Sequence, residues 1–88
     1  MKVSYHKKIL KELALIPQPS RIGIEHFVFD ELPLLNNFIE IKGVEKMTGY
    51  KGYFKIRFGD YRLGFYFGGD GIILERILHR KEIYRYYP

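Results

Sequence analysis

Apolar and polar side chains alternate along two neighbouring segments in the second half of the chain, residues 53–58 and 61–67. A period of two is typical of strands that are covered on one face only. Gly59 and Asp60 connect the segments, and a two-residue connection with glycine first suits a type II′ β-turn. Because that turn sets the register, we predict a hairpin with these facing pairs: Phe58 with Tyr61, Arg57 with Arg62, Ile56 with Leu63, Lys55 with Gly64, Phe54 with Phe65, and Tyr53 with Tyr66.

The two faces of the predicted hairpin differ in chemistry. One face is entirely apolar or aromatic and is expected to form the core: Phe54, Ile56, Phe58, Tyr61, Leu63, Phe65 and Phe67. The other face holds cations, phenols and a glycine gap: Tyr53, Lys55, Arg57, Arg62, Gly64 and Tyr66. Like charges that face each other destabilise a hairpin, and a phosphate bound between Arg57 and Arg62 would offset that repulsion.

A third strand is predicted over residues 72–78, after a glycine-rich turn over residues 68–71. Pairing across this turn puts Glu75 and Ile77 on the cationic face and Arg76 on the apolar face. A charged side chain is costly in a core unless it is paired. A β-bulge near the glycines, or an exposed edge of the core at Arg76, would resolve the conflict.

Helices are predicted in the first half of the chain. An apolar stripe at helical spacing marks the first helix: Ile9, Leu10, Leu13, Ala14 and Ile16. Pro17 and Pro19 end this helix, and Ser20 is placed to cap a second one. The stripe of the second helix, which Pro33 kinks or ends, comprises Ile24, Phe27, Val28, Leu32 and Leu35.

The remaining segments predict connections and one short strand. Residues 1–5 suit an edge strand, and Asn36-Asn37 suits a turn. Residues 39–50 are expected to form a loop with one helical turn at residues 44–47, closed by Gly49. The predicted fold class is therefore α+β, with two N-terminal helices packed on one face of a small, mainly antiparallel sheet of three to four strands.

Length and composition narrow the class of protein. A chain of 88 residues is expected to form a single domain over residues 1–88, because it is too short for a second core. The sequence has no cysteine, which excludes a disulfide framework, a cysteine zinc site and a thiol nucleophile. No apolar run reaches the ~18 residues of a membrane span, and the N-terminus lacks the apolar stretch of a signal peptide. A cytoplasmic location without a membrane partner is expected.

Charge is distributed unevenly along the chain. Residues 1–45 contain six Lys/Arg and six Asp/Glu, whereas residues 46–88 contain nine and four, which accounts for the whole net charge of +5. Seven of the eight tyrosines also lie in residues 46–88. A basic, tyrosine-rich half suits a partner with a phosphate backbone and bases that stack. A solvated basic surface beside an aromatic core is the alternative interpretation.

The segment after the third strand adds further candidates for chemistry. As a short helical turn, residues 79–85 place Arg80 and Tyr84 four positions apart and on one side. The third strand ends near the arginines of the hairpin, so six side chains are predicted to converge on one cleft: Lys55, Arg57, Arg62, His79, Arg80 and Tyr84. Three more residues are candidates for contacts with a substrate: Tyr53, Tyr66 and Lys51.

These residue types suit cleavage of RNA. A base removes the proton of the 2′-hydroxyl, which attacks the adjacent phosphate, while an acid protonates the departing 5′ oxygen and cations hold the charge on the phosphate. Arginine binds phosphate through two parallel hydrogen bonds, and Tyr84, His79 or Lys55 are the candidates for moving protons. No acidic cluster or histidine pair has the spacing of a metal site, so neither a metal nor another cofactor is predicted. Each residue alone also has a structural interpretation: a solvated strand face, a hydrogen-bonding histidine, or a tail packed over the core.

Three segments resemble the RelE/ParE toxin superfamily, in order and at matching spacings. They are Val44-Glu45-Lys46-Met47-Thr48-Gly49, Tyr53-Phe54-Lys55-Ile56-Arg57-Phe58-Gly59-Asp60-Tyr61-Arg62-Leu63 and His79-Arg80-Lys81-Glu82-Ile83-Tyr84-Arg85. The family pattern is a V-K-K-L-x-G lead-in, an R-x-R-x-G-D-Y-R hairpin and a closing H-R-x-x-x-Y. The resemblance covers essentially the whole chain and implies a RelE-like fold.

The resemblance also implies a function, that of a toxin of a toxin–antitoxin pair. Members of the RelE branch cut messenger RNA in the decoding site of the ribosome and are neutralised by an antitoxin. For the antitoxin of this chain, a basic groove predicts an acidic, helical segment. By this resemblance, Arg62 and Arg80 match the phosphate-stabilising arginines. Lys55 and Arg57 match the basic strand pair, in which Lys55 is a candidate base. Tyr84 matches the C-terminal tyrosine, and His79 matches the histidine of some branches.

Two alternatives to a ribonuclease stay open. The ParE branch of the superfamily acts on DNA gyrase and lacks most of the nuclease residues, and a basic module that binds without catalysis is the third interpretation. The sequence ends at Pro88, before the longer C-terminal helix of some relatives. The nuclease branch is favoured here because its pattern residues are present: Lys55, Arg57, Arg62, Arg80 and Tyr84.

Overall fold

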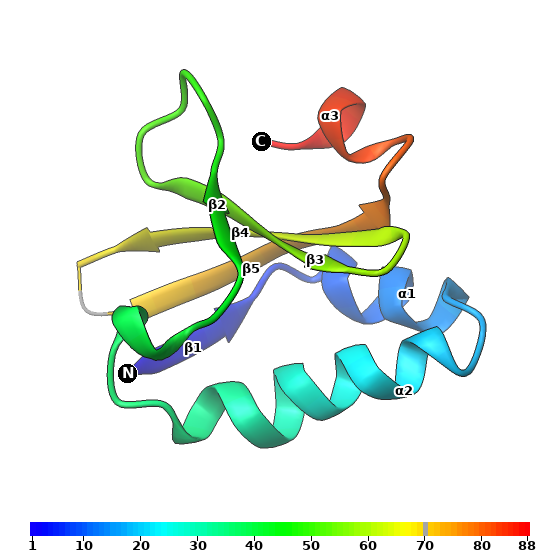
Figure 1. Cartoon of the computed structure of the whole chain (residues 1–88), viewed down its shortest axis with the longest axis horizontal. Helices are drawn as coiled ribbons and strands as arrows, with labels where there is room; N and C mark the ends of the chain where they lie inside the picture. The colour runs from blue at the N-terminus through cyan, green and yellow to red at the C-terminus, as the bar shows by residue number, and fades with distance from the viewer. Residues whose placement is uncertain (70) are drawn as a thin grey trace.

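Five strands form a single sheet in the computed structural model, which describes residues 1–69 and 71–88 (Figure 1). The strands lie in the spatial order β1–β5–β4–β3–β2. Their bounds are β1 Lys2–Tyr5, β2 Val44–Lys46, β3 Tyr53–Phe58, β4 Tyr61–Gly68 and β5 Gly71–His79. β1 runs parallel to β5 and the other neighbouring pairs are antiparallel, which confirms the α+β class and the edge strand at the N-terminus. Asp70, in the predicted glycine-rich turn, lies outside the described residues.

The hairpin of β3 and β4 has the predicted register at all six facing pairs, from Phe58 with Tyr61 to Tyr53 with Tyr66. Gly59 has a φ of 58°, whereas Asp60 does not have a positive φ. This is the combination that a type II′ turn requires. The turn and the alternation of the flanking strands were therefore enough to predict this pairing.

β5 contains a β-bulge, which resolves the conflict over Arg76. Gly64 pairs with Arg76 and the next residue of β4 pairs with Leu74, so Glu75 is the extra residue on β5. The bulge shifts the alternation by one position, and Ile77 enters the core with 1% of its surface exposed. The predicted positions of Arg76 on the apolar face and of Ile77 on the cationic face are wrong, because they assumed a continuous ladder.

The predicted helical turn at residues 44–47 is also wrong, since Val44–Lys46 form β2 and pair with β3. A segment this short carries too little periodicity to separate strand from helix. Its conformation is set by hydrogen bonds to the edge of β3, which would otherwise leave its backbone groups without partners. Gly49, with a φ of 86°, turns the chain after this strand. The sheet therefore has five strands rather than three to four.

Helices α1 and α2 cover one face of the sheet, and α3 lies on the opposite side (Figure 1). The helical segments are α1 Lys8–Leu15, α2 Ser20–Glu25, the π-helical η1 His26–Glu31, the 3₁₀ turns η2 Leu32–Leu34 and η3 Phe38–Glu40, and α3 Ile83–Tyr86. α2 continues directly into η1 and η2, where Pro33 ends the second predicted helix. Ser20 is the first residue of α2 and makes no capping hydrogen bond, so its predicted role as cap is wrong. None of these helices, all within the described residues, is long and apolar enough to cross a membrane.

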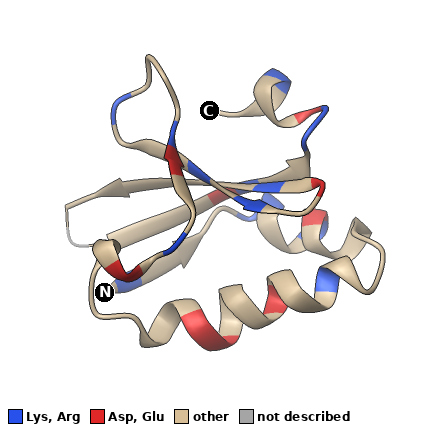
Figure 2. Ribbon diagram, in the orientation of Figure 1, with Lys and Arg blue, Asp and Glu red and all other residues tan. Residues whose placement is uncertain are grey.

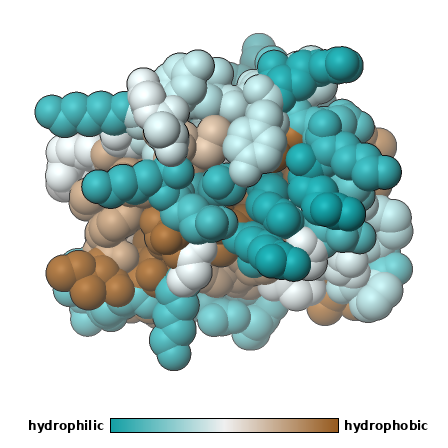
Figure 3. Space-filling model, turned by 45° about the horizontal axis from the view of Figure 1, so that its top comes forward, coloured by the Kyte–Doolittle hydropathy of each residue, from teal (hydrophilic) through white to brown (hydrophobic). Residues whose placement is uncertain are grey.

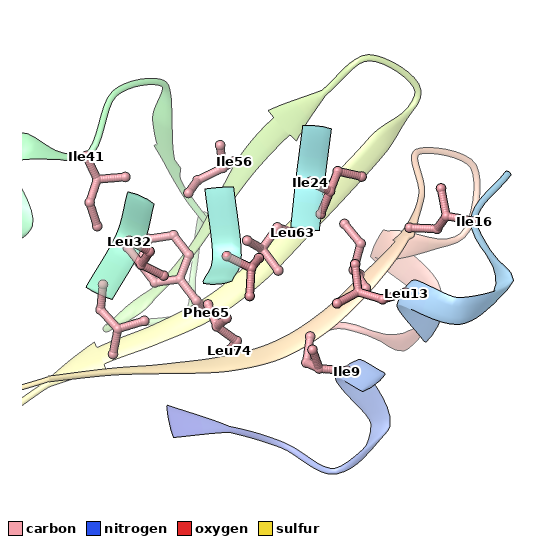
Figure 4. Close-up of a cluster of buried hydrophobic side chains, with 13 residues drawn as sticks. Ile9, Leu13, Ile16, Ile24, Leu32, Ile41, Ile56, Leu63, Phe65 and Leu74 are labelled. Carbon is pink, nitrogen blue, oxygen red and sulfur yellow. The ribbon is translucent and has the colours of Figure 1, made fainter. Parts of the chain in front are cut away.

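The main core lies between this helix layer and the sheet (Figure 4). Both predicted helical stripes contribute to it, through Ile9, Leu13, Ile16, Ile24, Val28 and Leu32. Leu10 and Ala14 are exposed, however, because the short α1 presents only a narrow stripe to β5. From the sheet come Ile56, Leu63, Phe65, Ile72, Leu74 and Ile77. Each such buried side chain stabilises the fold by about 1.5–3 kcal/mol.

Candidate functional site

The side of the sheet opposite α1 and α2, called the open face below, carries the cations of the predicted hairpin. Alternation along β3 and β4 places Lys55, Arg57 and Arg62 on it. Lys and Arg mark these strands and the adjoining loops, whereas Asp and Glu are prominent on the long helix of the other layer (Figure 2). Hydrophilic side chains extend over much of the surface when this side is turned forward (Figure 3).

Lys55 and Tyr84 are brought together on the open face from β3 and α3. The Lys55 Nζ lies 5.2 Å from the centre of the Tyr84 ring, within the range of a cation–π contact. The two residues line a groove of about 330 Å³, together with Lys46, Met47, Thr48, Tyr50 and Tyr87. Sequence reasoning missed the contributions of Lys46, Thr48 and Tyr50, because it assigned β2 and the following loop to one irregular segment.

The two facing arginines lie toward the hairpin turn at one end of the open face. Arg57 and Arg62 are direct cross-strand neighbours, as predicted. Arg57 is exposed, whereas the Arg62 guanidinium folds back on the turn. Its Nη1 donates to the carbonyl oxygens of Gly59, at 2.7 Å, and of Tyr61, at 3.0 Å. These carbonyl dipoles offset part of the repulsion between the two cations, and they hold Arg62 at the edge of the face.

Arg80 reaches the same turn from the end of β5. Its backbone N–H donates to the Asp60 carbonyl at 2.7 Å, and its Nε lies 3.5 Å from the Asp60 carboxylate. The helical turn predicted over residues 79–85 begins only at Ile83. The predicted helical spacing of Arg80 and Tyr84 is therefore wrong, because a hydrogen bond from the Arg80 N–H to the hairpin turn holds Arg80 outside the helix.

His79 lies on the face that the helices cover. It faces Tyr61 across the ladder, with the ring centres 5.6 Å apart and the rings nearly perpendicular. It lines a groove that includes Glu12 of α1, and its Nδ1 accepts a hydrogen bond of 3.1 Å from the Lys81 N–H. The prediction that all six candidates converge is wrong for His79, because strand alternation separates it from Lys55.

The three predicted substrate contacts lie toward the other end of the hairpin. The rings of Tyr53 and Tyr66 pack together with their centres 4.9 Å apart, and both residues are half-buried. Lys51 is exposed in the loop between β2 and β3, where it lines a groove of about 720 Å³ with Tyr53. Their contact with a substrate stays a prediction.

The gap at Gly64 is filled by Tyr87, the residue that follows α3. A Cβ at Gly64 would lie 2.6 Å from atoms of the Tyr87 ring. The Tyr87 hydroxyl lies 2.8 Å from the Phe54 carbonyl oxygen and 2.6 Å from that of Phe65, and its single O–H is shared between these two acceptors. Burial raises the pKa of this hydroxyl well above its usual value, so it remains a donor. Glycine inside a strand indicates close approach by another group, and this was the signal available in the sequence.

Tyr87 belongs to a second, smaller apolar cluster on the open face. Its buried members are Met47, Ile83 and Tyr87, with Tyr53 and Leu78 packed against them. The alternative interpretation of the tyrosine-rich tail, that it packs over a core, is therefore confirmed for Tyr87. Tyr84 differs, because 64% of its surface is exposed beside the groove.

The residue types on the open face are those that proteins use to bind phosphate and to exchange protons. Arginine supplies a planar set of N–H donors that matches phosphate, and an amine beside a phenol provides two groups able to exchange protons with a substrate. Among residues 1–69 and 71–88, no group of three His, Asp or Glu side chains could hold a metal ion.

Comparison with known proteins agrees with the fold and with the resemblance found in the sequence. Residues 2–84 match the family described as the ParE toxin of the type II toxin–antitoxin system parDE. The chain is 39% identical over 89 residues to the toxin RelE3 of Methanocaldococcus jannaschii, and the alignment covers 100% of both chains.

Solved structures give the same result. The toxin–antitoxin complex RelB–RelE of Methanococcus jannaschii includes a chain that superimposes with a TM-score of 0.77 at 35% identity, over 97% of this chain and 99% of that one. The complex RelBE2 of Mycobacterium tuberculosis matches with a TM-score of 0.64 at 21% identity, over 90% of each chain, and supports the fold alone.

Proposed function

The chain belongs to the RelE/ParE superfamily and is a toxin of a type II toxin–antitoxin system, and we propose that it is an endoribonuclease that cuts messenger RNA on the ribosome without a metal ion. The superfamily contains a nuclease branch and a branch that acts on DNA gyrase, so the choice depends on the site. The full-length relative and the most similar structure reported above both carry the RelE name.

In the proposed reaction the 2′-hydroxyl of the RNA attacks the adjacent phosphorus atom. The new P–O bond closes a 2′,3′-cyclic phosphate, and the bond to the 5′ oxygen of the next nucleotide breaks. One group takes the proton of the 2′-hydroxyl, and another gives a proton to the departing oxygen. Lys55 and Tyr84 are the proposed pair for these transfers. Arg57, Arg62 and Arg80 are proposed to stabilise the charge on the phosphate.

The observation that carries this proposal is the position of Lys55. It lies on the same face of the same strand as Arg57, and its amine is 5.2 Å from the centre of the exposed Tyr84 ring. A phosphate between the facing arginines would therefore lie on the face that also presents the amine and the phenol. Arg62 is bonded through Nη1, and a guanidinium has further N–H donors for a phosphate.

A gyrase inhibitor is the second candidate, because the matching family is described as the ParE toxin. Such a protein has no need for a proton-transfer pair. The two candidates therefore differ in what happens when the site is altered but the fold is kept.

The test is induced expression in cells, with primer extension on a translated message. The wild type is compared with Arg62→Ala and Tyr84→Phe, and with Lys11→Ala as a control in which an exposed cation is lost from the helix layer. We expect new cleavage sites that require translation, that persist in Lys11→Ala, and that weaken by about 10²–10⁴-fold in Tyr84→Phe, the usual contribution of a general acid or base. Growth arrest with intact messages would contradict the nuclease and support the gyrase inhibitor.

An antitoxin is the partner proposed for the open face. The similar structures described above are toxin–antitoxin complexes, and the cations of β3 and β4 favour an acidic segment. The ribosome and its message are the other proposed partners, and both present dense phosphate.

A further inference from the structure

The helix that carries Tyr84 is too short to hold its own position. α3 has four residues, Ile83–Tyr86, and its N-terminus has no side-chain cap. A single helical turn is unstable on its own, and Tyr84 itself is 64% exposed. The place of the Tyr84 ring above Lys55 must therefore come from the residues that flank it. Ile83 is fully buried and Tyr87 is 3% exposed.

Tyr87 is the anchor on the C-terminal side. Its N–H donates to the Ile83 carbonyl at 2.8 Å, which closes the turn. Its ring fills the gap over Gly64, and its hydroxyl bridges one carbonyl of β3 and one of β4. The single hydroxyl proton is shared between these two carbonyl oxygens, and their contacts fix the far end of the buried ring in place. Apolar packing alone would leave the position of the hydroxyl less defined.

The position of Tyr87 over Gly64 is next to the proposed proton-transfer pair, Lys55 and Tyr84. Gly64 is the direct cross-strand neighbour of Lys55. Tyr87 therefore packs over Gly64, and Tyr84 packs against the neighbouring Lys55. The two tyrosines are three positions apart on one turn of the chain. A shift of Tyr87 away from Gly64 moves Tyr84 relative to Lys55.

Arg76 holds the same segment from a second side. Its Nη1 donates to the Tyr86 carbonyl at 3.3 Å, and its guanidinium lies 5.7 Å from the centre of the Tyr86 ring. The Glu12 carboxylate fixes the guanidinium through Nε, at 2.7 Å, and Nη2, at 2.6 Å. The β-bulge in β5 places Arg76 where it reaches both α1 and the C-terminal segment.

We propose that Tyr87, seated over Gly64, is a positioning residue that holds Tyr84 above Lys55 for RNA cleavage. This inference rests on the proposed function and deepens it. Tyr87 takes no part in the proton transfers, because its hydroxyl is buried between two backbone carbonyls. Misplacing a reacting group by about 1 Å costs on the order of 100-fold in rate, so a small movement of the anchor is expected to have a large effect.

The first experiment compares Tyr87→Phe with Tyr86→Phe as its matched control. Both changes remove one hydroxyl from neighbouring positions, but the Tyr86 side chain is 49% exposed. Single-turnover cleavage of a defined message is measured on programmed ribosomes at several toxin concentrations. We expect Tyr87→Phe to lower the maximal rate about 10–100-fold and to leave the half-saturating concentration unchanged. Tyr86→Phe is expected to keep the wild-type rate.

A second pair of variants displaces the ring instead of removing its hydroxyl. Gly64→Ala puts a methyl group where the Tyr87 ring lies, whereas Gly23→Ala is the matched control in open space on α2. Gly64→Ala is expected to lower the cleavage rate as Tyr87→Phe does. Because both changes act on the same ring, their effects on the rate are expected to be clearly less than additive in the double variant.

A measurement that does not depend on catalysis tests the position of Tyr84 separately from the proposed function. Fluorotyrosine in place of Tyr84 reports the surroundings of that ring by fluorine NMR. The signal is expected to move in Tyr87→Phe and to stay in place in Tyr86→Phe. If the wild type cuts no message, the proposed function fails and so does the catalytic part of the inference, while the fluorine signal still tests the anchor.

Two results of the cleavage assay would overturn the positioning role. One is a folded Tyr87→Phe protein that cleaves at the wild-type rate, which would make Tyr87 a stabilising residue only. The other is a loss of activity that comes entirely from a higher half-saturating concentration, because Tyr87 would then act in binding. An unchanged fluorine signal in Tyr87→Phe would contradict the anchor itself.

Discussion

Arg57, Arg62 and Gly64 oppose the stability of the hairpin. Facing like charges cost up to about 1 kcal/mol, and a glycine inside a strand costs about 0.5–1 kcal/mol relative to alanine. The structure explains Gly64, because the ring of Tyr87 occupies the space of its missing side chain. The carbonyls that accept from Arg62 offset only part of the repulsion between the arginines, and the proposed phosphate would offset the rest. Packing of Tyr87 therefore explains the glycine, whereas the arginine pair is assigned to the proposed binding of phosphate.

The buried hydroxyl of Tyr87 predicts a loss of stability at alkaline pH. Burial raises its pKa in the folded protein above the ~10 of a free phenol. A raised pKa contributes stability that is fully present below pH ~10 and is lost as the pH rises above that value. The difference in urea unfolding free energy between the wild type and Tyr87→Phe is therefore expected to be largest near pH 8 and to shrink between pH ~10 and ~11.5. Tyr86→Phe is the control, because Tyr86 is exposed. A difference in unfolding free energy between the wild type and Tyr87→Phe that stays constant across this pH range would contradict the account.

The elements depend on one another at the edges of the sheet. β1 pairs with β5 only through residues 71–74. Beyond that point Glu12 of α1 takes the place of the neighbouring strand, because its Oε1 accepts from the Ile77 N–H at 3.0 Å. Its Oε2 accepts from Arg76. One carboxylate therefore joins a helix, the bulge in β5 and, through Arg76, the C-terminal segment.

Replacing Glu12 is expected to destabilise the whole protein. In Glu12→Ala the Ile77 N–H and the Arg76 guanidinium lose their acceptor, which costs about 1–3 kcal/mol for partly buried groups. Urea unfolding followed by circular dichroism measures the change. The control is Lys11→Ala, one residue away and exposed, which is expected to stay within about 0.5 kcal/mol of the wild type. Equal stability of the two variants would show that the carboxylate does not join these elements.

The whole molecule presents two different surfaces, because the sheet separates them. The charges of residues 1–45, which include the helix layer, balance, whereas residues 46–88 carry the whole excess of Lys and Arg (Figure 2). A net charge of +5 on a small protein attracts acidic partners over several ångströms at low salt. Binding of the proposed antitoxin is therefore an electrostatic event at this scale.

Affinity for the cognate antitoxin is expected to fall as salt is added. Between 0.1 M and 1 M salt the Debye length shrinks from ~10 Å to ~3 Å, and an interface of facing charges loses affinity by about tenfold or more. Titration calorimetry at several salt concentrations measures the slope. Arg57→Ala is expected to reduce the slope and Lys11→Ala to leave it unchanged. An affinity that does not depend on salt would contradict an acidic partner on the open face.

Much of the candidate site could be predicted from the sequence, but the residues that come from β2, β5 and their flanking loops could not. Lys55, Arg57 and Arg62 were placed on one face because strand alternation and the Gly59–Asp60 turn are local features. His79 was misplaced because the bulge in β5 reverses the alternation after Glu75, and the conflict at Arg76 indicated a bulge only as one of two solutions, without its position. Tyr50 was missed because it joins the groove through β2, whose conformation depends on its partner strand.

The sequence by itself determined the hairpin, its register and the chemistry of its two faces. Those properties follow from a turn and a period of two, and they involve residues that are near one another in the chain. Only the tertiary structure decided what covers the open face. The seat of Tyr87 over Gly64 and the bridge from Glu12 to β5 join residues far apart in sequence. Such contacts depend on the packing of the whole chain, because no short segment contains both partners.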